Sequence, residues 1–239
     1  MLQACLNGGR AVGEHPAVPL SPDELAGAAA AAVAAGASSL HVHPRDGDGR
    51  ESLDAEVVGA AVAAIRRACP GVPLGVTTGA WIEPDPERRR ARVAAWRIRP
   101  DFASVNFSEP GAVALCRTLD DLGVGVEAGL WSVDDVERFV AAPPRVLRIL
   151  VEAPEPDPGA GAATALAIER ALDGAGGPGA GAPRLVHGQE AAAWPILVAA
   201  LRRGRDVRIG LEDVLVLPDG RPARDNAELV AAAAALVGA

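Results

Sequence analysis

The sequence predicts a single (β/α)8 barrel over residues 1–239, and three observations lead to this fold class. Eight short apolar runs alternate with eight helical segments, at a spacing of roughly 30 residues for each strand–helix unit. Polar side chains stand at the carboxyl ends of the apolar runs, where a barrel of this class places its active site. No Gly-x-Gly-x-x-Gly motif follows a strand and no P-loop is present, which disfavours an open doubly wound sheet, the alternative fold.

The composition excludes several classes of function. The 239 residues are 49% hydrophobic and carry a net charge of −8, which allows a large core but disfavours binding to nucleic acid or to an anionic membrane. All 23 residues counted as lysine or arginine are arginine, and the chain contains no tyrosine. An enzyme without lysine cannot form a Schiff base, so carbonyl chemistry would need a metal ion or an arginine to stabilise developing negative charge.

The N-terminus, the apolar runs and the cysteines predict a cytoplasmic protein. Residues 1–5 lack the basic region and apolar core of a signal peptide, and the longest apolar runs are alanine-rich, interrupted by glycine and unlike membrane spans. Cys5, Cys69 and Cys116 are odd in number and widely spaced. They form neither a disulfide framework nor a cysteine-based zinc pattern, and they fit a reducing compartment.

The first half of the chain is expected to form four strand–helix units. The strand at 2–6 leads into Asn7-Gly8-Gly9-Arg10, whose glycines allow the backbone to approach a ligand closely. Ser21-Pro22-Asp23-Glu24 is a capping box with proline at the first helical position, and it opens a helix that stops at Gly36. Asp85-Pro86 opens a helix to about residue 97 in a similar way. The other expected elements here are strands at 39–43, 72–76 and 102–105 and helices at 53–68 and 112–122.

The second half is expected to form four more units. Ser132 caps the first of its helices, and Asp225 with Glu228 forms the capping box of the last. A stiff acidic loop at 154–158 precedes a helix from about Ala162. The other expected elements are strands at 124–128, 146–151, 184–186 and 207–211, a glycine-rich turn at 174–181 and a helix at 191–203.

Polar residues end most of these strands or start the loops that follow them. Because parallel strands in a barrel share one carboxyl end, these side chains are expected to gather at one rim. Charged side chains are rarely buried unless they are paired or bound to a metal, so their clustering points to a functional site. The residues in question are Asn7, His41, His43, Thr77, Asn106, Glu127, Glu152, His187, Glu212 and Asp213.

His41 and His43 form the first part of a candidate metal site. Residues two apart on a strand point to the same face, so the two imidazoles project together while Val42 turns away. A His-x-His pair at a strand end followed by a charged loop is a suitable two-ligand platform for Zn²⁺ or a similar divalent ion. The alternative is two polar residues that close a strand without a ligand.

A carboxylate from another strand should complete the site, and Glu212 at the end of the eighth strand is preferred over Glu127 and Glu152. Two histidines and one glutamate leave coordination positions open, as in catalytic metal sites. Such an ion can polarise a ketone or thioester oxygen. Glu127 is interpreted either as support for the metal ligands or as a hydrogen-bonded carboxylate of the barrel interior.

Arg208 and Asp213 are the candidate catalytic pair. Arginine in the middle of a strand is unusual unless it points inward to an anion, so Arg208 is expected to orient Asp213. Asp213 would then remove a proton next to a carbonyl group. The alternative is that Arg208 is a solvated basic residue at the start of the strand.

These residues resemble the β-keto acid cleavage enzymes, the family that includes 3-keto-5-aminohexanoate cleavage enzyme. The resemblance covers nearly the whole chain, and its first and last motifs together are specific. The motifs are His41-Val42-His43-Pro44-Arg45-Asp46 with Gly49-Arg50, Thr77-Thr78-Gly79, Ala103-Ser104-Val105-Asn106-Phe107, Arg208-Ile209-Gly210-Leu211-Glu212-Asp213 and Asn226-Ala227-Glu228-Leu229-Val230.

The resemblance implies a (β/α)8 barrel with one Zn²⁺ per chain held by His41, His43 and Glu212. It implies a retro-Claisen-type exchange in which a β-keto acid and acetyl-CoA give a new CoA thioester and acetoacetate, with Asp213 and Arg208 as the general base. It also implies a homo-oligomer, a dimer or tetramer. The expected substrate-contacting residues are Thr77, Ser104 and Asn106, which would line the pocket and hold oxyanions, together with Asn7, Arg10, Arg45, Thr78, Glu127 and His187.

Arg10 departs from the family pattern, because some members place an acidic residue there to receive a substrate amino group. An arginine predicts an anionic or neutral substrate tail, or no contact with the tail.

Three alternative functions remain open from the sequence. The first is a CoA-independent, metal-dependent keto acid aldolase or lyase. The second is a metal-dependent amidohydrolase, although those barrels usually place His-x-His on the first strand and a lone aspartate on the last. The third is a barrel that binds a metal or metabolite without catalysis, which the presence of Arg208 and Asp213 disfavours.

Overall fold

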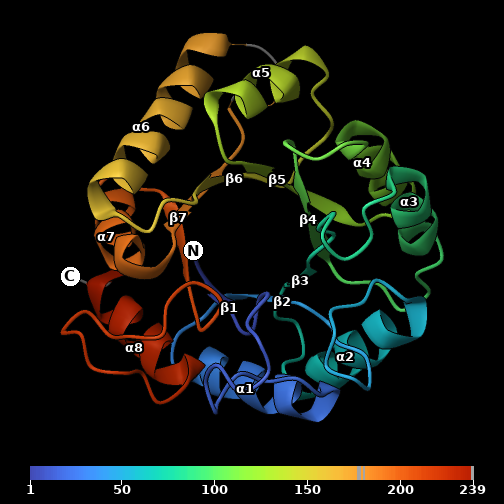
Figure 1. Cartoon of the computed structure of the whole chain (residues 1–239), viewed down its shortest axis with the longest axis vertical. Coiled ribbons are helices and arrows are strands. Elements are labelled where there is room, and N and C mark those ends of the chain that lie inside the picture. The colour runs from blue at the N-terminus through green and yellow to red at the C-terminus, as the bar shows by residue number, and fades with distance from the viewer. Residues whose placement is uncertain (177–178, 180, 238–239) are drawn as a thin grey trace.

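Eight parallel strands close into a barrel in strand order β1 to β8 (Figure 1). The structure is a computed structural model that describes residues 1–176, 179 and 181–237. The barrel closes where β1 pairs with β8, with Gln3 opposite Arg208. This confirms the predicted (β/α)8 fold and excludes the open sheet. The strands are β1 (Leu2–Cys5), β2 (Ser39–Val42), β3 (Leu74–Val76), β4 (Phe102–Asn106), β5 (Gly125–Leu130), β6 (Arg148–Ala153), β7 (Arg184–Gly188) and β8 (Asp206–Ile209).

One α-helix follows each strand, and the helices surround the barrel as an outer ring (Figure 1). A short 3-10 helix, η1 (Glu190–Ala192), precedes the seventh. The α-helices are α1 (Pro22–Ala34), α2 (Ala55–Ala68), α3 (Pro86–Ala94), α4 (Ala112–Asp121), α5 (Val133–Ala141), α6 (Pro158–Ala175), α7 (Ala193–Leu201) and α8 (Asn226–Val237).

The helix starts show where local sequence was sufficient. The Ser21 side chain accepts from the backbone N–H of Glu24 and the Glu24 side chain accepts from that of Ser21, so the predicted capping box of α1 is confirmed. Ser132 caps α5 as predicted, by accepting from the backbone N–H of Asp135. Asp225 accepts from the backbone N–H of Glu228, but the Glu228 carboxylate accepts from Arg224 and not from Asp225, so this last box is formed only in part.

Several predicted boundaries differ from the structure by two or more residues, among them those of α6, α3 and β6. Helix α6 begins at Pro158 and not near Ala162, because Asp157 accepts from the backbone N–H of Ala160, the same aspartate–proline start as in α3. Helix α3 ends at Ala94, and strand β6 is shifted toward the C-terminus by two residues. Of the predicted glycine-rich turn at 174–181, residues 174–175 end α6, and residues 177–178 and 180 lie outside the described residues.

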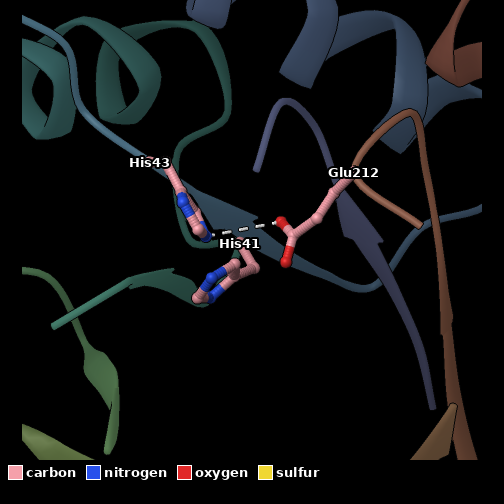
Figure 2. Close-up of side chains that lie close together, drawn as sticks. All are labelled: His41, His43 and Glu212. Atoms are coloured by element: carbon pink, nitrogen blue, oxygen red, sulfur yellow. Dashed lines mark ion pairs between the residues drawn. The ribbon is translucent and has the colours of Figure 1, made fainter. Parts of the chain in front are cut away.

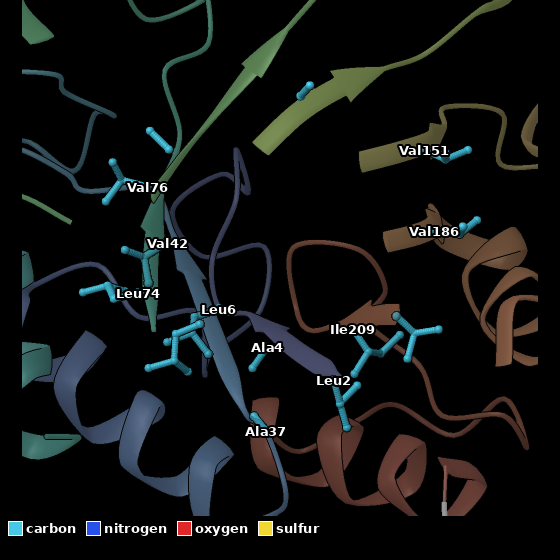
Figure 3. Close-up of a cluster of buried hydrophobic side chains, with 14 of the residues drawn as sticks. Leu2, Ala4, Leu6, Ala37, Val42, Leu74, Val76, Val151, Val186 and Ile209 are labelled. Atoms are coloured by element: carbon cyan, nitrogen blue, oxygen red, sulfur yellow. The ribbon is translucent and has the colours of Figure 1, made fainter. Parts of the chain in front are cut away.

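The apolar side chains that face away from the barrel axis pack against the helices. Strand residues of this kind belong to one buried cluster with helix residues such as Leu25, Val58 and Leu229. Figure 3 shows part of the cluster, with side chains from neighbouring strands gathered on the same side of the ribbon. Strand residues labelled there are Leu2, Ala4, Val42, Leu74, Val76, Val151, Val186 and Ile209. Cys5, Cys69 and Cys116 are free and buried, in agreement with the prediction that they form no disulfide framework.

The side chains that face the barrel axis are unusually polar. Gln3 on β1 donates to the Glu127 carboxylate on β5 at 3.3 Å, and these strands lie on opposite sides of the barrel. The Arg148 guanidinium lies 2.8 Å from the same carboxylate and 4.9 Å from the centre of the Phe102 ring. A buried ion pair between the neighbouring strands β5 and β6 therefore lies inside the barrel, and the hydrogen bond from Gln3 reaches it across the interior.

The interior pair gives the first prediction. Glu127→Leu leaves the buried Arg148 guanidinium without its carboxylate, which should lower the free energy of unfolding by about 3–5 kcal/mol. The double variant Glu127→Leu/Arg148→Met replaces both charges with apolar groups and should recover most of that loss. Urea unfolding of the wild type and the two variants measures both the loss of stability and its recovery. A double variant no more stable than Glu127→Leu would show that the pair is not the source of the stability.

Candidate metal centre and general base

His41, His43 and Glu212 meet at the carboxyl end of the barrel, as the sequence predicted for a metal site (Figure 2). One ligand atom from each of the three residues lies within 4.8 Å of the others. Nε2 of His43 lies 3.6 Å from Oε2 of Glu212, and the two imidazole rings are 5.2 Å apart in an edge-to-face arrangement. Neutral imidazole and carboxylate are the donors that zinc and other divalent transition metals accept.

The backbone at Gly8 makes room for Glu212. Gly8 has φ +51°, and a Cβ atom built there would lie 2.4 Å from Cγ of Glu212. Only glycine satisfies both the left-handed backbone and this close approach. Gly8, in the loop after the first strand, therefore leaves room for a side chain of the candidate site itself.

Arg208 holds Glu212 and Asp213 through a single nitrogen atom. Its Nη2 donates to Oε1 of Glu212 at 2.8 Å and to Oδ1 of Asp213 at 2.7 Å. Among the described residues, the second oxygens of both carboxylates, Oε2 of Glu212 and Oδ2 of Asp213, are buried without a hydrogen-bond partner. Buried orphan acceptors are costly unless a ligand satisfies them. One carboxylate thus offers a free oxygen toward His43, and the other offers one able to accept a proton.

His187 connects Asp213 to a further carboxylate. Its Nδ1 lies 3.4 Å from Oδ1 of Asp213, and its Nε2 lies 3.3 Å from Oε2 of Glu152. Gln189 donates to the other oxygen of Glu152 at 3.0 Å. An imidazole between two carboxylates is stabilised in its protonated form.

Burial and neighbouring charges set the protonation of these groups. Burial, with His43 and Arg208, holds the pKa of His41 well below its usual value, so the ring is neutral and able to bind a metal. Burial would raise the pKa of Asp213, but Arg208 and His187 outweigh it and lower the pKa, so this carboxylate is ionised. Burial and Arg208 oppose the charge on His187, but Glu152 and Asp213 raise its pKa to about 9.

Glu127, predicted to contact substrate or support the ligands, lies deeper in the barrel. Burial raises its pKa despite the nearby charges of Arg148 and Arg208, and its Oε2 is buried without a partner in the part of the chain that the structure describes. Its other oxygen is the one held by Arg148 and Gln3. Contact with substrate remains a prediction for this residue.

Asn7 and Arg45, two of the predicted substrate contacts, bind the backbone of the rim. Asn7 accepts from the N–H of His43 and donates to the His43 and Pro19 carbonyls. Arg45 donates to the carbonyls of Gly8, Gly49 and Arg10. Both side chains thus hold the loops around the candidate ligands, and their contact with substrate remains a prediction.

Arg10 lies at the mouth of the site and is already paired. Its guanidinium contacts Glu14 at 2.7 Å and Glu190 at 2.6 Å, and it donates to the Leu211 carbonyl at 2.8 Å. Its charge is therefore matched by two carboxylates. An anionic substrate tail, the expectation from the sequence, would have to displace one of them.

The other predicted contacts come from β4 and the loop that follows β3. Thr77 is buried and its hydroxyl oxygen accepts from the N–H of Gly79 at 3.2 Å, which leaves the hydroxyl hydrogen available to a ligand. The Thr78 hydroxyl donates to the Ser104 carbonyl at 2.5 Å, so its hydrogen is in use. Asn106 donates to Glu109 at 2.9 Å. The roles of these four residues toward substrate remain predictions.

A cavity of about 270 Å³ opens beside the His–His–Glu group. The sequence did not predict some of the residues around this cavity, because no local motif distinguishes them. Glu51 contacts His43, and Trp81 reaches the site from the loop after β3, a placement that depends on the closed barrel. The lining residues are Gly9, Arg10, Glu14, His43, Trp81, Trp131, Glu152, Gln189, Glu190 and Glu212.

A larger cavity of about 740 Å³ lies at the opposite end, around the amino ends of β4, β6 and β8. It is mostly apolar and contains none of the candidate ligands. Because barrels of this class carry their chemistry at the carboxyl ends of the strands, the smaller cavity is the candidate active site.

The fold and the site together define a (β/α)8 barrel with a group able to hold a divalent metal beside a buried Arg–Asp pair. A family model described as beta-keto acid cleavage enzyme matches residues 1–239. The chain belongs to the beta-keto acid cleavage enzyme family, as its motifs predicted.

Individual relatives agree with this membership. The chain is 34% identical over 80 residues to the 3-keto-5-aminohexanoate cleavage enzyme of Fusobacterium nucleatum subsp. nucleatum, an alignment that covers 33% of this chain and 29% of that enzyme. Its fold is similar to that of ObcA in a binary complex with oxaloacetate, with a TM-score of 0.70, 17% identity, and coverage of 90% of this chain and 62% of ObcA. A ternary complex of ObcA with a C4-CoA adduct and oxalate gives the same values.

The chain thus spans less than two thirds of the length of these relatives. At 17% identity the likeness to ObcA shows the fold alone. Among the described residues, no helix combines the length and the apolar character that crossing a bilayer requires.

The protonation of His187 gives the second prediction. Its folded-state pKa of about 9 lies above its ordinary value of 6.5. The stability that its charge contributes is therefore complete below about pH 6.5 and is lost as the pH rises through about 9. Urea titrations of the metal-free protein at pH 6 and at pH 9.5 measure the free energy of unfolding. This free energy should fall more from pH 6 to pH 9.5 in the wild type than in His187→Gln. Equal falls would contradict the ion-paired imidazolium.

Proposed function

We propose that this chain is a metal-dependent acyltransferase that cleaves the carbon–carbon bond of a β-keto acid and exchanges acyl groups with acetyl-CoA. In balanced form, R-CO-CH2-COO⁻ and acetyl-CoA give R-CO-CoA and acetoacetate. The observation that carries the proposal is the shared hold of Arg208 on Glu212 and Asp213, which leaves one oxygen free on each. Support for the substrate class comes from the family and from the oxaloacetate and C4-CoA adduct named for the ObcA complexes.

The residues present fit a divalent ion, with Zn²⁺ as the proposed metal at one per chain. His41 is neutral and buried, its Nδ1 has no hydrogen-bond partner among the described residues, and Oε2 of Glu212 is likewise free. His41, His43 and Glu212 would hold the ion. When bound, it supplies Lewis-acid polarisation of a keto or thioester oxygen.

Asp213 is the proposed general base. Its Oδ2 is free to accept a proton from the carbon between the keto group and the carboxylate of the substrate. Arg208 holds the other oxygen, which fixes the direction in which the free oxygen points. The cation of Arg208 beside the site also favours negative charge on the deprotonated substrate.

The cavity sets the size of what can react there. A volume of about 270 Å³ holds a small keto acid and the end of an acyl-pantetheine arm, so the nucleotide part of CoA would remain outside. The hydroxyl of Thr77 and the side chains of Ser104 and Asn106 are the proposed contacts for substrate oxygens. We further propose a cytoplasmic homo-oligomer in which residues 1–239 form a single domain.

Removal of the metal ligands is the third prediction. Elemental analysis of purified protein should find about one divalent ion per chain, as in mononuclear catalytic sites. His41→Ala and Glu212→Ala should lose it, because each removes one of three protein ligands. Circular dichroism checks that the variants remain folded. Full metal content in both folded variants would place the ion elsewhere.

The fourth prediction tests the reaction. When the protein is incubated with a panel of β-keto acids, a new CoA thioester and acetoacetate should form only if acetyl-CoA is present. Mass spectrometry detects both products. Asp213→Asn should keep the metal and lower turnover by about 10²–10⁴-fold, because its amide cannot accept the proton.

Other outcomes of the panel separate the alternatives. Cleavage without acetyl-CoA would support the lyase. Amide hydrolysis without keto acid cleavage would support the amidohydrolase. Turnover by Asp213→Asn at the wild-type rate would remove Asp213 from its role.

A further inference from the structure

Trp81 is a half-exposed aromatic residue placed directly on the candidate metal site. Its side chain is 51% exposed, yet the indole stacks on the His43 ring with centroids 6.2 Å apart and planes at 22°. The His43 side chain beneath it is only 6% exposed. The indole therefore covers the face of a candidate ligand that would otherwise meet solvent.

Trp81 also fixes the carboxylate that holds His43. The indole N–H donates to both oxygens of Glu51, at 3.1 and 3.0 Å. Oε1 of Glu51 lies 2.5 Å from Nδ1 of His43, and Nε2 of the same ring faces Glu212 at 3.6 Å. A continuous chain of contacts thus runs from Trp81 through Glu51 and His43 to the centre of the site.

The direction of this chain determines which nitrogen can bind a metal. An ionised carboxylate accepts hydrogen bonds and donates none, so Nδ1 of His43 carries the hydrogen. In the neutral imidazole that binding a metal requires, the lone pair is then on Nε2, the nitrogen that faces Glu212. Partners of this kind orient metal-binding histidines and select their tautomer.

The surrounding loops are built to hold Trp81 and Glu51 in place. A Cβ atom at residue 79 would lie 2.3–2.4 Å from the Trp81 ring, so the indole can lie here only because Gly79 has no side chain. The backbone of Glu51 pairs with that of Arg45 in an isolated antiparallel bridge. With the backbone fixed, the remaining freedom of Glu51 is that of its side chain, and the indole N–H restricts it.

We propose that Trp81 is a positioning residue for the metal centre, and that it acts through Glu51 to hold His43 with Nε2 directed at the ion. This inference rests on the metal site of the proposed function. It concerns Trp81 and Glu51, residues of the loops after β3 and β2 that lie outside the candidate ligand set.

The test measures Zn²⁺ affinity by competition with a chromophoric chelator. Trp81→Phe keeps an aromatic ring over His43 but removes the N–H, and it should weaken binding by about tenfold or more, as for other supporting partners of ligands. Glu51→Ala should weaken binding at least as much. In the Glu51→Ala background, Trp81→Phe should have no further effect, because its route to His43 is gone.

A matched control is Trp194→Phe, whose indole N–H donates to the Val216 carbonyl at 2.8 Å and does not contact the site. It should leave the Zn²⁺ affinity unchanged. Long-range ¹H–¹⁵N spectra of the metal-free imidazoles give a second reading, with His43 held as the Nδ1–H tautomer in the wild type and mixed in Glu51→Ala. Thermal melting confirms that each variant is folded.

The outcomes distinguish this inference from the proposed function. A wild type that binds no Zn²⁺ refutes the metal site itself. If the wild type binds Zn²⁺ and folded Trp81→Phe binds it with the same affinity, the proposed role of Trp81 is refuted. An equal loss from Trp81→Phe in the wild-type and Glu51→Ala backgrounds refutes action through Glu51.

Discussion

The hold of one guanidinium on two adjacent carboxylates is the interaction on which the candidate site depends. Nη2 of Arg208 donates to both Glu212 and Asp213, and both bonds are made inside the barrel. Burying three charges is costly unless each is paired. Here the pairing uses only one oxygen of each carboxylate, so the same contact that stabilises the charges leaves Oε2 of Glu212 free toward His43 and Oδ2 of Asp213 without a hydrogen-bond partner among the described residues.

The closed barrel makes this arrangement possible. Arg208 pairs in register with Gln3 where β8 meets β1, so it faces the axis at the seam of the barrel. From there it influences His41 on β2 and Glu127 on β5, whose pKa values are shifted partly by its charge. The charged side chains inside the barrel consequently influence one another, and the candidate site lies where they reach the carboxyl ends of the strands.

Some polar residues at the rim bind the backbone of the loops and are not candidate metal ligands, and the reason is the hydrogen bonding that the loop backbone requires. Loops that carry ligands expose N–H and C=O groups that must be satisfied. Asn7 and Arg45 satisfy those of the first two loops, and Arg10 is neutralised by Glu14 and Glu190. Rigid loops hold the ligands in one geometry, which a preorganised site requires. A polar residue at the rim of the barrel can therefore serve to hold the loops, as Asn7 and Arg45 do.

Local sequence determined the number and type of elements, the caps at Ser21 and Ser132, and the pairing of His41 with His43, because each depends on neighbours within a few residues. The missed start of α6 had a local signal, the Asp157-Pro158 pair. Only the tertiary structure decided that Trp81 covers His43, that Glu51 holds it, and that Arg10 is already paired with Glu190. These contacts join loops distant in sequence, and the shape of the closed barrel sets their distances, which no periodicity or spacing in the sequence encodes.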